Sequence, residues 1–373
     1  MIRKWVVIGI VLLFVGTCII PSVPSEQTHS KNIITVDDEA GLADYTSILD
    51  ALNNSHPGDT IQVFSGKYNE HSLGILTRNL TLQGVPYDLP GGDDTGKPLV
   101  YSNISDKAYD IFFIRETGAS INGFKLCNIG DFVYNSIIII YSNNSIITGN
   151  EFNDISDIHG YIPYGILLIN GNHSVISHNQ FSQCGESICI HDNYNTVDGN
   201  RINQTGLGIV ITGHHHRISN NTIESARQYG ILLGSSSNDN ITGNNIIDGY
   251  WGLYFEHSNS YNMVYRNNFK GNVYALEVAA DFLEHATQNV IRQNNFIDNN
   301  QTITLYCPIL SRYLKLDGNY YSHWSRMPIR IILGTKILLK IPIGIFYIPV
   351  LVPWFLFDWH PAKQPYDIPG GFQ

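Results

Sequence analysis

A short pattern decides the fold of this chain, beginning as Ile147-Thr148-Gly149-Asn150-Glu151-Phe152 and returning as Ile176-Ser177-His178-Asn179-Gln180-Phe181. Five further copies keep the asparagine at the fourth position and an apolar residue at the sixth: Val197–Ile202, Ile218–Ile223, Ile241–Ile246, Val264–Phe269 and Ile291–Phe296. The intervals between successive asparagines are 29, 21, 21, 23, 23 and 27 residues. Ile121–Leu126 is an earlier, degenerate copy. A repeat of this size indicates a solenoid.

A second apolar segment lies about halfway round each unit: Gly165–Ile169, Ser187–His191, Gly208–Thr212, Gly230–Gly234, Gly252–Glu256 and Ala275–Ala279. Alternate strand residues share a face, so the aliphatic residues form one inward column. A unit of about 22 residues is too short for a crossover through a helix, which needs about 30. We therefore predict an all-β fold, a right-handed parallel β-helix whose asparagines form a ladder at a bend. Packed hairpins of a sandwich do not predict this asparagine spacing.

The two ends of the chain differ from the repeats. Residues 1–25 contain a basic start and an apolar run, which predicts a signal peptide or an N-terminal membrane anchor. We expect residues 31–325 to form the β-helix domain, with an amphipathic helix within Thr46–Asn54 capping its first coil. Residues 326–373 form a Pro-rich apolar extension, predicted to be a hairpin that packs on the β-helix. Contact with a membrane interface is the alternative for this extension.

Composition limits the partners. Charged residues make up 14% of the chain and the net charge is −10, which argues against binding nucleic acid and against docking on anionic lipid by charge alone. The cysteines Cys127, Cys184, Cys189 and Cys307 follow the predicted signal, and their spacing assigns no disulfide pairing.

The repeat register predicts one group of neighbouring polar residues, at the end of the second strand. His191 and Asp192 on one coil, with His214 on the next, come within reach of one another because coils rise by about 4.8 Å. Glu256 and His257 lie three coils from His191. Imidazole and carboxylate groups can bind a divalent metal, so calcium or copper stays open although no cofactor is identified. Exposed polar turn residues are the simpler interpretation.

Aromatic residues also recur in register. Tyr229, Trp251 and Tyr274 precede the repeated Gly or Ala on three consecutive coils. An outward column of rings would offer a platform for sugars. Strand alternation, however, gives Tyr229 the same parity as the inward Ile231, so we predict a structural stack at a coil corner.

Several segments together resemble the NosD-like, pectin-lyase-like family of right-handed β-helix repeat proteins: Asp44–Ile48, Pro57–Tyr68, the repeats themselves and the ending Asn319–Trp324. Phe357–Pro361 resembles a tail found on archaeal cell-surface members. The resemblance covers residues 31–325 and implies the fold. It selects no activity, because this fold carries lyases, hydrolases, epimerases and adhesins. It also implies a copper-related accessory role as a weaker option.

The catalytic groups that enzymes of this fold use have no clear counterpart in the repeats of this sequence. Lyases that the chain resembles use carboxylates for calcium beside a basic residue, and the repeats show no such column. The acidic pairs Asp37-Asp38 and Asp93-Asp94 are interpreted as solvated turns. We therefore expect an exported protein, extracellular or at the cell surface, that binds polysaccharide or cell-envelope components without catalysis. The alternative is a carbohydrate-active enzyme, either a polysaccharide lyase or a glycoside hydrolase.

Overall fold

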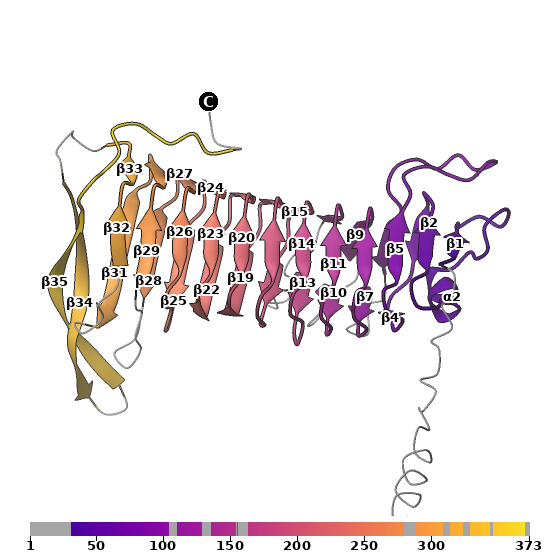
Figure 1. Cartoon of the computed structure of the whole chain (residues 1–373), viewed down its shortest axis with the longest axis horizontal. Coiled ribbons are helices and arrows are strands. Elements are labelled where there is room, and N and C mark those ends of the chain that lie inside the picture. The colour runs from indigo at the N-terminus through magenta and orange to yellow at the C-terminus, as the bar shows by residue number, and fades with distance from the viewer. Residues whose placement is uncertain are drawn as a thin grey trace, which may run out of the picture. The chain divides into compact units, whose positions relative to one another are not determined.

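The computed structural model describes residues 31–103, 110–128, 136–153, 155, 163–279, 288–308, 314–323, 329–343 and 346–369. All of them belong to one compact unit, Lys31–Gln373. Its strands follow one another in chain order along a stack of coils (Figure 1). The predicted all-β parallel β-helix is confirmed. Within the described part of the chain, no helix is long and apolar enough to cross a membrane.

Strands pair in parallel with their counterparts one coil away, which builds three faces. Face 1 holds the second segment of each repeat and consists of β4 (Leu73–Ile75), β7 (Phe112–Ile114), β10 (Ser136–Ile140), β13 (Tyr164–Leu168), β16 (Glu186–Ile190), β19 (Leu207–His214), β22 (Tyr229–Ser237), β25 (Trp251–Glu256), β28 (Tyr274–Ala279), β31 (Gln301–Pro308) and β34 (Arg330–Ile343).

Face 2 follows face 1 in each coil and holds the residues just before the repeated asparagine. It consists of β1 (Ile33–Val36), β2 (Thr60–Val63), β5 (Thr81–Gly84), β8 (Ser120–Asn122), β11 (Ile146–Thr148), β14 (Val175–Ser177), β17 (Thr196–Asp198), β20 (Arg217–Ser219), β23 (Asn240–Thr242), β26 (Met263–Tyr265), β29 (Asn289–Arg292), β32 (Leu314–Asp317) and, through Asp358 alone, β35 (Phe346–Asp358).

Face 3 holds the residues just after the asparagine. It consists of β3 (Lys67–Asn69), β6 (Leu99–Ser102), β9 (Lys125–Asn128), β12 (Glu151–Asn153), β15 (Gln180–Ser182), β18 (Arg201–Asn203), β21 (Thr222–Glu224), β24 (Asn245–Ile247), β27 (Asn268–Lys270), β30 (Asn295–Ile297) and β33 (Tyr320–Tyr321).

The interior of the coils is filled by columns of apolar side chains, as the repeat predicts. Ile188, Ile209 and Ile231 are register partners on successive coils and are fully buried. Phe152 and Phe181 stack on face 3 with ring centroids 4.5 Å apart. Burying one such side chain contributes roughly 1.5–3 kcal/mol. Repetition of this contribution stabilises units that could not fold alone.

The repeated asparagines form a continuous ladder at the bend between face 2 and face 3, which we call the Asn corner. Asn221 Oδ1 accepts hydrogen bonds from the backbone N–H of Asn200 at 2.9 Å and from Asn200 Nδ2 at 3.0 Å. Asn221 Nδ2 donates to the carbonyl of Val197 at 2.9 Å. The same pattern links eight buried residues: Asn150, Asn179, Asn200, Asn221, Asn244, Asn267, Asn294 and Asn319. The predicted ladder is confirmed.

Asp358 of the C-terminal segment ends this ladder. Its Oδ2 accepts from the backbone N–H and from Nδ2 of Asn319, each at 3.0 Å, as a further asparagine would. Its Oδ1 accepts from the N–H of Gly318 at 3.0 Å, and the hydroxyl of Tyr321 donates to Oδ2 at 3.1 Å. The carboxylate is fully buried. The last asparagine of the ladder needs only a hydrogen-bond acceptor beyond it, and the carboxylate of Asp358 supplies that acceptor.

The C-terminal segment forms an antiparallel hairpin of β34 and β35, drawn in gold in Figure 1. β34 adds in parallel to β31 of face 1, and Ile332 joins the core. The domain boundary at residue 326 and contact with a membrane stay predictions.

A short helix, α2 (Ile48–Asn53), forms within the predicted segment. Ser47 caps its N-terminus by accepting from the N–H of Asp50. Ile48, Ala51 and Leu52 are buried in the core of the first coils.

Candidate functional site

The outward side of face 1 carries a strip of apolar and aromatic residues that we call the ledge. Its register partners on β13, β16, β19, β22, β25 and β28 are Tyr164, Glu186, Leu207, Tyr229, Trp251 and Tyr274 in one row, and Leu167, Cys189, Val210, Leu232, Tyr254 and Glu277 in the other. Cys189, Leu207 and Val210 are buried in a hydrophobic cluster separate from the interior core. A contiguous apolar strip on the outside of a fold is a candidate binding surface.

Three aromatic rings of the ledge stack along consecutive coils. The ring centroids of Tyr229 and Trp251 lie 4.9 Å apart, and those of Trp251 and Tyr274 lie 5.7 Å apart. Both faces of the Trp251 indole are therefore covered, and its Nε1 donates to Glu277 Oε2 at 2.9 Å. Tyr254 packs across Tyr229 and Trp251 at centroid distances of 4.7 and 5.8 Å. The rings are half-buried, so they present edges and hydroxyls to the outside.

The predicted stack at the coil corner forms, but the parity that gave Tyr229 an inward side chain is wrong. Tyr229 packs against the outer cluster, whereas Ile231 lies in the core. Gly230 between them is buried, and a Cβ there would lie 2.7 Å from the carbonyl oxygen of Gly252. The backbone approaches its neighbour closely at this glycine, so strict alternation is interrupted.

Glu186 is a buried carboxyl in the ledge. Its side chain is buried, and Oε2 has no hydrogen-bond partner. Burial raises the pKa of this carboxyl to about 7. Burial likewise raises the pKa of its register partner Tyr164 to about 12, helped by the charge of Glu186. The sequence pattern did not single out Glu186. It stands two residues before the core residue Ile188, in the row that the aromatic residues occupy on other coils.

The predicted residues His191, Asp192 and His214 lie at one end of face 1 on two adjacent coils, but each bonds elsewhere. His191 Nδ1 lies 3.0 Å from Thr212 Oγ1, and its Nε2 lies 3.3 Å from Cys189 Sγ. Asp192 Oδ2 accepts from the N–H of Gly171 at 2.9 Å. His214 Nδ1 lies 2.7 Å from Ser237 Oγ.

Glu256 and His257 adjoin each other at the end of β25, with Oε2 and Nε2 4.0 Å apart, and both side chains are more than 40% exposed. Glu256 is the register partner of Gly234, as predicted. The next position is shifted, because a bulge between Ile211 and Gly213 pairs Gly213 with Ser236 rather than Ser235. Gly213 has φ +103°, and a Cβ there would lie 2.4 Å from the carbonyl oxygen of Asp192. A ligand role for the five predicted residues stays a prediction.

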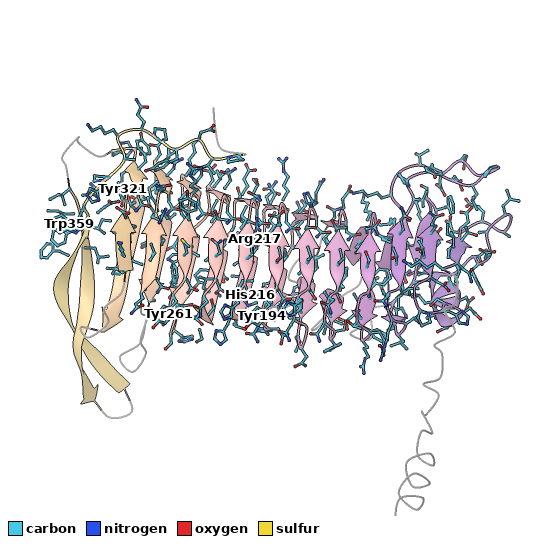
Figure 2. All side chains as sticks on the ribbon, in the orientation of Figure 1. Tyr194, His216, Arg217, Tyr261, Tyr321 and Trp359 are labelled. Carbon is cyan, nitrogen blue, oxygen red and sulfur yellow. The ribbon has the colours of Figure 1, made fainter. Side chains whose placement is uncertain are left out.

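The bend between face 1 and face 2 carries a second, mixed ladder that we call the mixed corner. The backbone N–H of each member donates to the side chain of the next, in the order Ser145, Ser174, Asn195, His216, Asp239, Asn262 and Asn289. His216 is buried, while its neighbour His215 is exposed and stacks on Tyr194 with ring centroids 4.8 Å apart. Figure 2 labels Tyr194, His216 and Tyr261 along this edge of the coils.

A groove of about 440 Å³ follows the bend from face 3 into face 1 and is lined by Gln183, Gln204, Ser225 and Arg227. Arg227 stands two residues before Tyr229, so the groove lies at the rim of the ledge. Gln183, Gln204 and Ser225 repeat at the same bend of successive coils with positive φ.

The comparisons with known proteins agree with this architecture. The family model NosD, described as periplasmic copper-binding protein (NosD), matches residues 101–325, which is more than half of the chain. The chain belongs to the NosD family. A search of the curated proteins finds no significant match. No comparison bears on the resemblance to archaeal cell-surface members.

Among solved structures, NosD-family residues of this chain superpose on two lyases. A mannuronic acid specific polysaccharide family 6 lyase from human gut microbiota is 13% identical, with 78% of this chain and 81% of that chain covered and a TM-score of 0.53. A rhamnogalacturonan lyase is 10% identical, with 78% and 87% covered and a TM-score of 0.52. At this identity the likeness shows the fold alone.

Proposed function

We propose that this NosD-family chain is an exported, non-catalytic β-helix that binds an uncharged glycan along the ledge of face 1. The observation that carries the proposal is the continuous aromatic and apolar strip over six coils, accompanied by Glu186 and Glu277 and by no Lys or Arg in strands β13, β16, β19, β22, β25 and β28.

The chemistry of the ledge suits sugars. Tyr and Trp combine an apolar ring with a polar group, so the ring edges and hydroxyls that the ledge presents can contact the C–H groups and hydroxyls of a sugar. Carboxylates such as Glu277 accept hydrogen bonds from hydroxyl groups. A strip of regularly spaced groups also fits a repeating polymer better than a single small molecule. The named activities of the two superposed lyases concern polysaccharides as well.

The negative charge of the ledge favours an uncharged glycan over a polyuronate. A polyuronate would bring its carboxylates against Glu186 and Glu277, and like charges at short range repel. The ledge strands hold no Lys or Arg that could offset this repulsion. A neutral glycan avoids the penalty.

The same geometry disfavours cleavage with Glu186 as the acid. A glycoside hydrolase places two carboxyl groups about 5 to 9.5 Å apart. Glu186 has the raised pKa of a proton donor, but Glu256 lies three coils further along, which alone separates them by about 14 Å at one rung per 4.8 Å, and it also lies nearer the other end of its strand. A lyase acting on a polyuronate needs a cation to stabilise the developing charge, and the ledge strands supply none.

Export is part of the proposal and rests on the N-terminal sequence, with its basic start and apolar run. The family description, which is periplasmic, agrees with it. A compartment outside the cytoplasm is also where extended glycans are found.

The family description names copper, so the ligands that the described residues offer decide whether copper fits this chain. Copper favours imidazole and sulfur ligands. Among the described residues, Cys189 Sγ and His191 Nε2 are a close pair, 3.3 Å apart. The described groups in which three or more metal-binding side chains converge are all carboxylate. The described residues therefore do not supply a copper centre with three soft protein ligands, and the proposed function involves no copper.

The test is glycan binding by purified Lys31–Gln373, the compact unit. Affinity electrophoresis against neutral β-glucan, xylan and mannan, with alginate and polygalacturonate alongside, should show retardation by a neutral polymer only. Trp251→Ala should weaken that binding about tenfold or more, which corresponds to ~1.4 kcal/mol. The matched control is Tyr194→Ala, which removes an exposed aromatic ring on the mixed-corner edge and should leave binding unchanged.

Three results would overturn the proposal: binding only to polyuronates, equal loss in both variants, or release of shortened sugars. Cleavage that stops on adding a chelator would establish the enzyme alternative. Glu186→Gln would then show whether that carboxyl transfers the proton, because it should abolish cleavage while retaining binding.

A further inference from the structure

The first coils bring together carboxylates that the sequence separates by about 50 residues. Asp37, Asp38 and Glu39 follow β1, while Asp88 and Asp94 lie in the loop between β5 and β6. One oxygen each of Asp37, Glu39 and Asp88 lies within 4.8 Å of the others, and the same holds for Asp38, Glu39 and Asp94. Glu39 belongs to both groups. Asp37 is buried, so the expectation of a solvated turn is wrong for it, whereas Asp38 and Asp93 are exposed in loops as expected.

Asp37 provides a second and independent observation. Its side chain is only 5% exposed, and its Oδ1 has no hydrogen-bond partner. A buried carboxylate oxygen without a partner loses its hydration without compensation. Here it also faces two further carboxyl groups. None of the five acids has an ion pair with Lys or Arg among the described residues.

Backbone hydrogen bonds already fix two of these side chains. Asp38 Oδ2 accepts from the N–H of Lys67 at 3.0 Å. Asp88 accepts from the N–H of Leu89 at 2.7 Å and from that of Asp94 at 3.0 Å. The carboxylates are thus held in place by the fold. The loop after β1 and the loop after β5 bring these carboxylates together, and like charges at short range are unfavourable unless a cation lies between them.

We propose that Asp37, Glu39 and Asp88, extended by Asp38 and Asp94 through the shared Glu39, bind a calcium ion that joins the loop after β1 to the 84–97 loop. Calcium takes oxygen ligands at about 2.3–2.6 Å, so two ligands of one ion are at most about 5 Å apart. The 4.8 Å separation within each group meets this limit.

The donor set distinguishes the cation. Carboxylate oxygens alone suit hard cations and not copper or zinc. Two adjoining groups with a shared side chain suit the flexible, high coordination number of calcium better than the strict octahedron of magnesium. The inference is independent of the glycan proposed for face 1, because the acids lie outside the ledge.

The experiment is a calcium titration of the purified protein after chelation, followed by calorimetry and thermal unfolding. We expect binding in the range of extracellular calcium sites, with a dissociation constant of about 1 mM or below, and a rise of the melting temperature by a few degrees. Hydrogen exchange should slow in residues 37–39 and in the 84–97 loop and nowhere along the ledge.

The variants separate a site from general surface charge. Glu39→Gln should weaken calcium binding at least tenfold, whereas the matched control Asp93→Asn, in the same loop with the same charge change, should not alter it. Asp37→Asn should raise the melting temperature of the chelated protein, because it relieves repulsion, and should remove the response to calcium. No calcium-dependent change in the wild type, an equal loss in Glu39→Gln and Asp93→Asn, or an equal response to magnesium would each overturn the proposal.

Discussion

The Asn corner and the mixed corner are two bends of the same coil, and they satisfy their backbone N–H groups with different side chains. The Asn corner uses asparagine on every coil from Asn150 to Asn319, whereas the mixed corner uses Ser, Asn, His and Asp at equivalent places. Both satisfy the backbone N–H of one coil with a side-chain acceptor from the next. The difference lies in the second task. At the Asn corner each amide Nδ2 also donates to a carbonyl of an earlier coil, as Asn221 does to Val197. At the mixed corner the asparagines Asn262 and Asn289 make such a bond, whereas the Ser and Asp members have no amide to make it.

This extra donor explains which bend tolerates variety. An acceptor alone can be a hydroxyl, an imidazole nitrogen or a carboxylate, whereas the amide of asparagine supplies an acceptor and a donor from one short side chain. Asn195 of the mixed corner illustrates the point, because its Nδ2 is buried without a partner. The mixed corner therefore admits groups that titrate within its ladder, whereas the Asn corner has one only at its end, the carboxylate of Asp358.

The largest effect should come from removing the carboxylate that ends the Asn corner. Asp358→Ala leaves the buried donors of Gly318, Asn319 and Tyr321 without an acceptor. Each buried donor left unsatisfied costs about 1–3 kcal/mol, so we expect a loss of about 4 kcal/mol at the C-terminal end. Hydrogen exchange should localise the loss to β32, β33 and β35. Asp358→Asn keeps one acceptor oxygen and should lose less; equal losses in both variants would contradict the ladder-end role.

The second effect compares the two bends within one coil. Asn200 and Asn195 are both buried and lie five residues apart. Asn200→Ser removes donors to the carbonyl of Ile176 and to Asn221 Oδ1, so we expect a loss of about 2–4 kcal/mol. Asn195→Ser retains an acceptor for Ser174 and loses no amide bond, so its loss should stay below about 1 kcal/mol. Urea unfolding of both variants measures the difference, and similar losses would contradict the division of tasks.

The Asn corner could be predicted from sequence because its chemistry allows one residue type. The spacing of Asn150 to Asn294 places every coil from Ile121 to Phe296 in register. Asp358 could not be predicted in the same way. It lies 39 residues after Asn319 and belongs to a different kind of segment, so only the folded chain shows that it continues the ladder.

The ledge was predicted in part. The recurrence of Tyr229, Trp251 and Tyr274 identified a column, but alternation gave it the wrong side, because Gly230 admits a close backbone approach that no period describes. The calcium-type cluster could not be predicted at all. Its members come from two loops whose meeting depends on the stacking of β1, β2 and β5. Repetition predicts what is shared between coils, and candidate sites arise where coils differ.

The third prediction uses a titratable member of the mixed corner. His216 accepts the N–H of Asn195 through Nδ1 and bonds the carbonyl of Thr212 through Nε2, which requires the neutral ring. Burial lowers its pKa from 6.5 to about 4. The unfolded chain therefore binds this proton more tightly, and stability falls as the pH drops from 6.5 to about 4, by ~3 kcal/mol at most. Urea unfolding of His216→Asn at these pH values should show a flatter profile; an unchanged profile would contradict the assignment.

The smallest effect has the opposite sign and lies on the next coil. Burial raises the pKa of Asp239 from 3.8 to about 6, although Ser236 and the N–H of His216 donate to it. The folded chain binds this proton more tightly, so its contribution to stability is present below pH 3.8 and is lost as the pH rises through about 6. Asp239→Asn installs the uncharged acceptor found at Asn262 on the following coil and should stabilise the protein at pH 7 by about 1–2 kcal/mol, with no gain at pH 4. Urea unfolding at the two pH values checks this, with Asp198→Asn, a half-exposed aspartate on β17, as the matched control. A gain at pH 4 equal to that at pH 7 would mean that charge burial is not what distinguishes the mixed corner from the Asn corner.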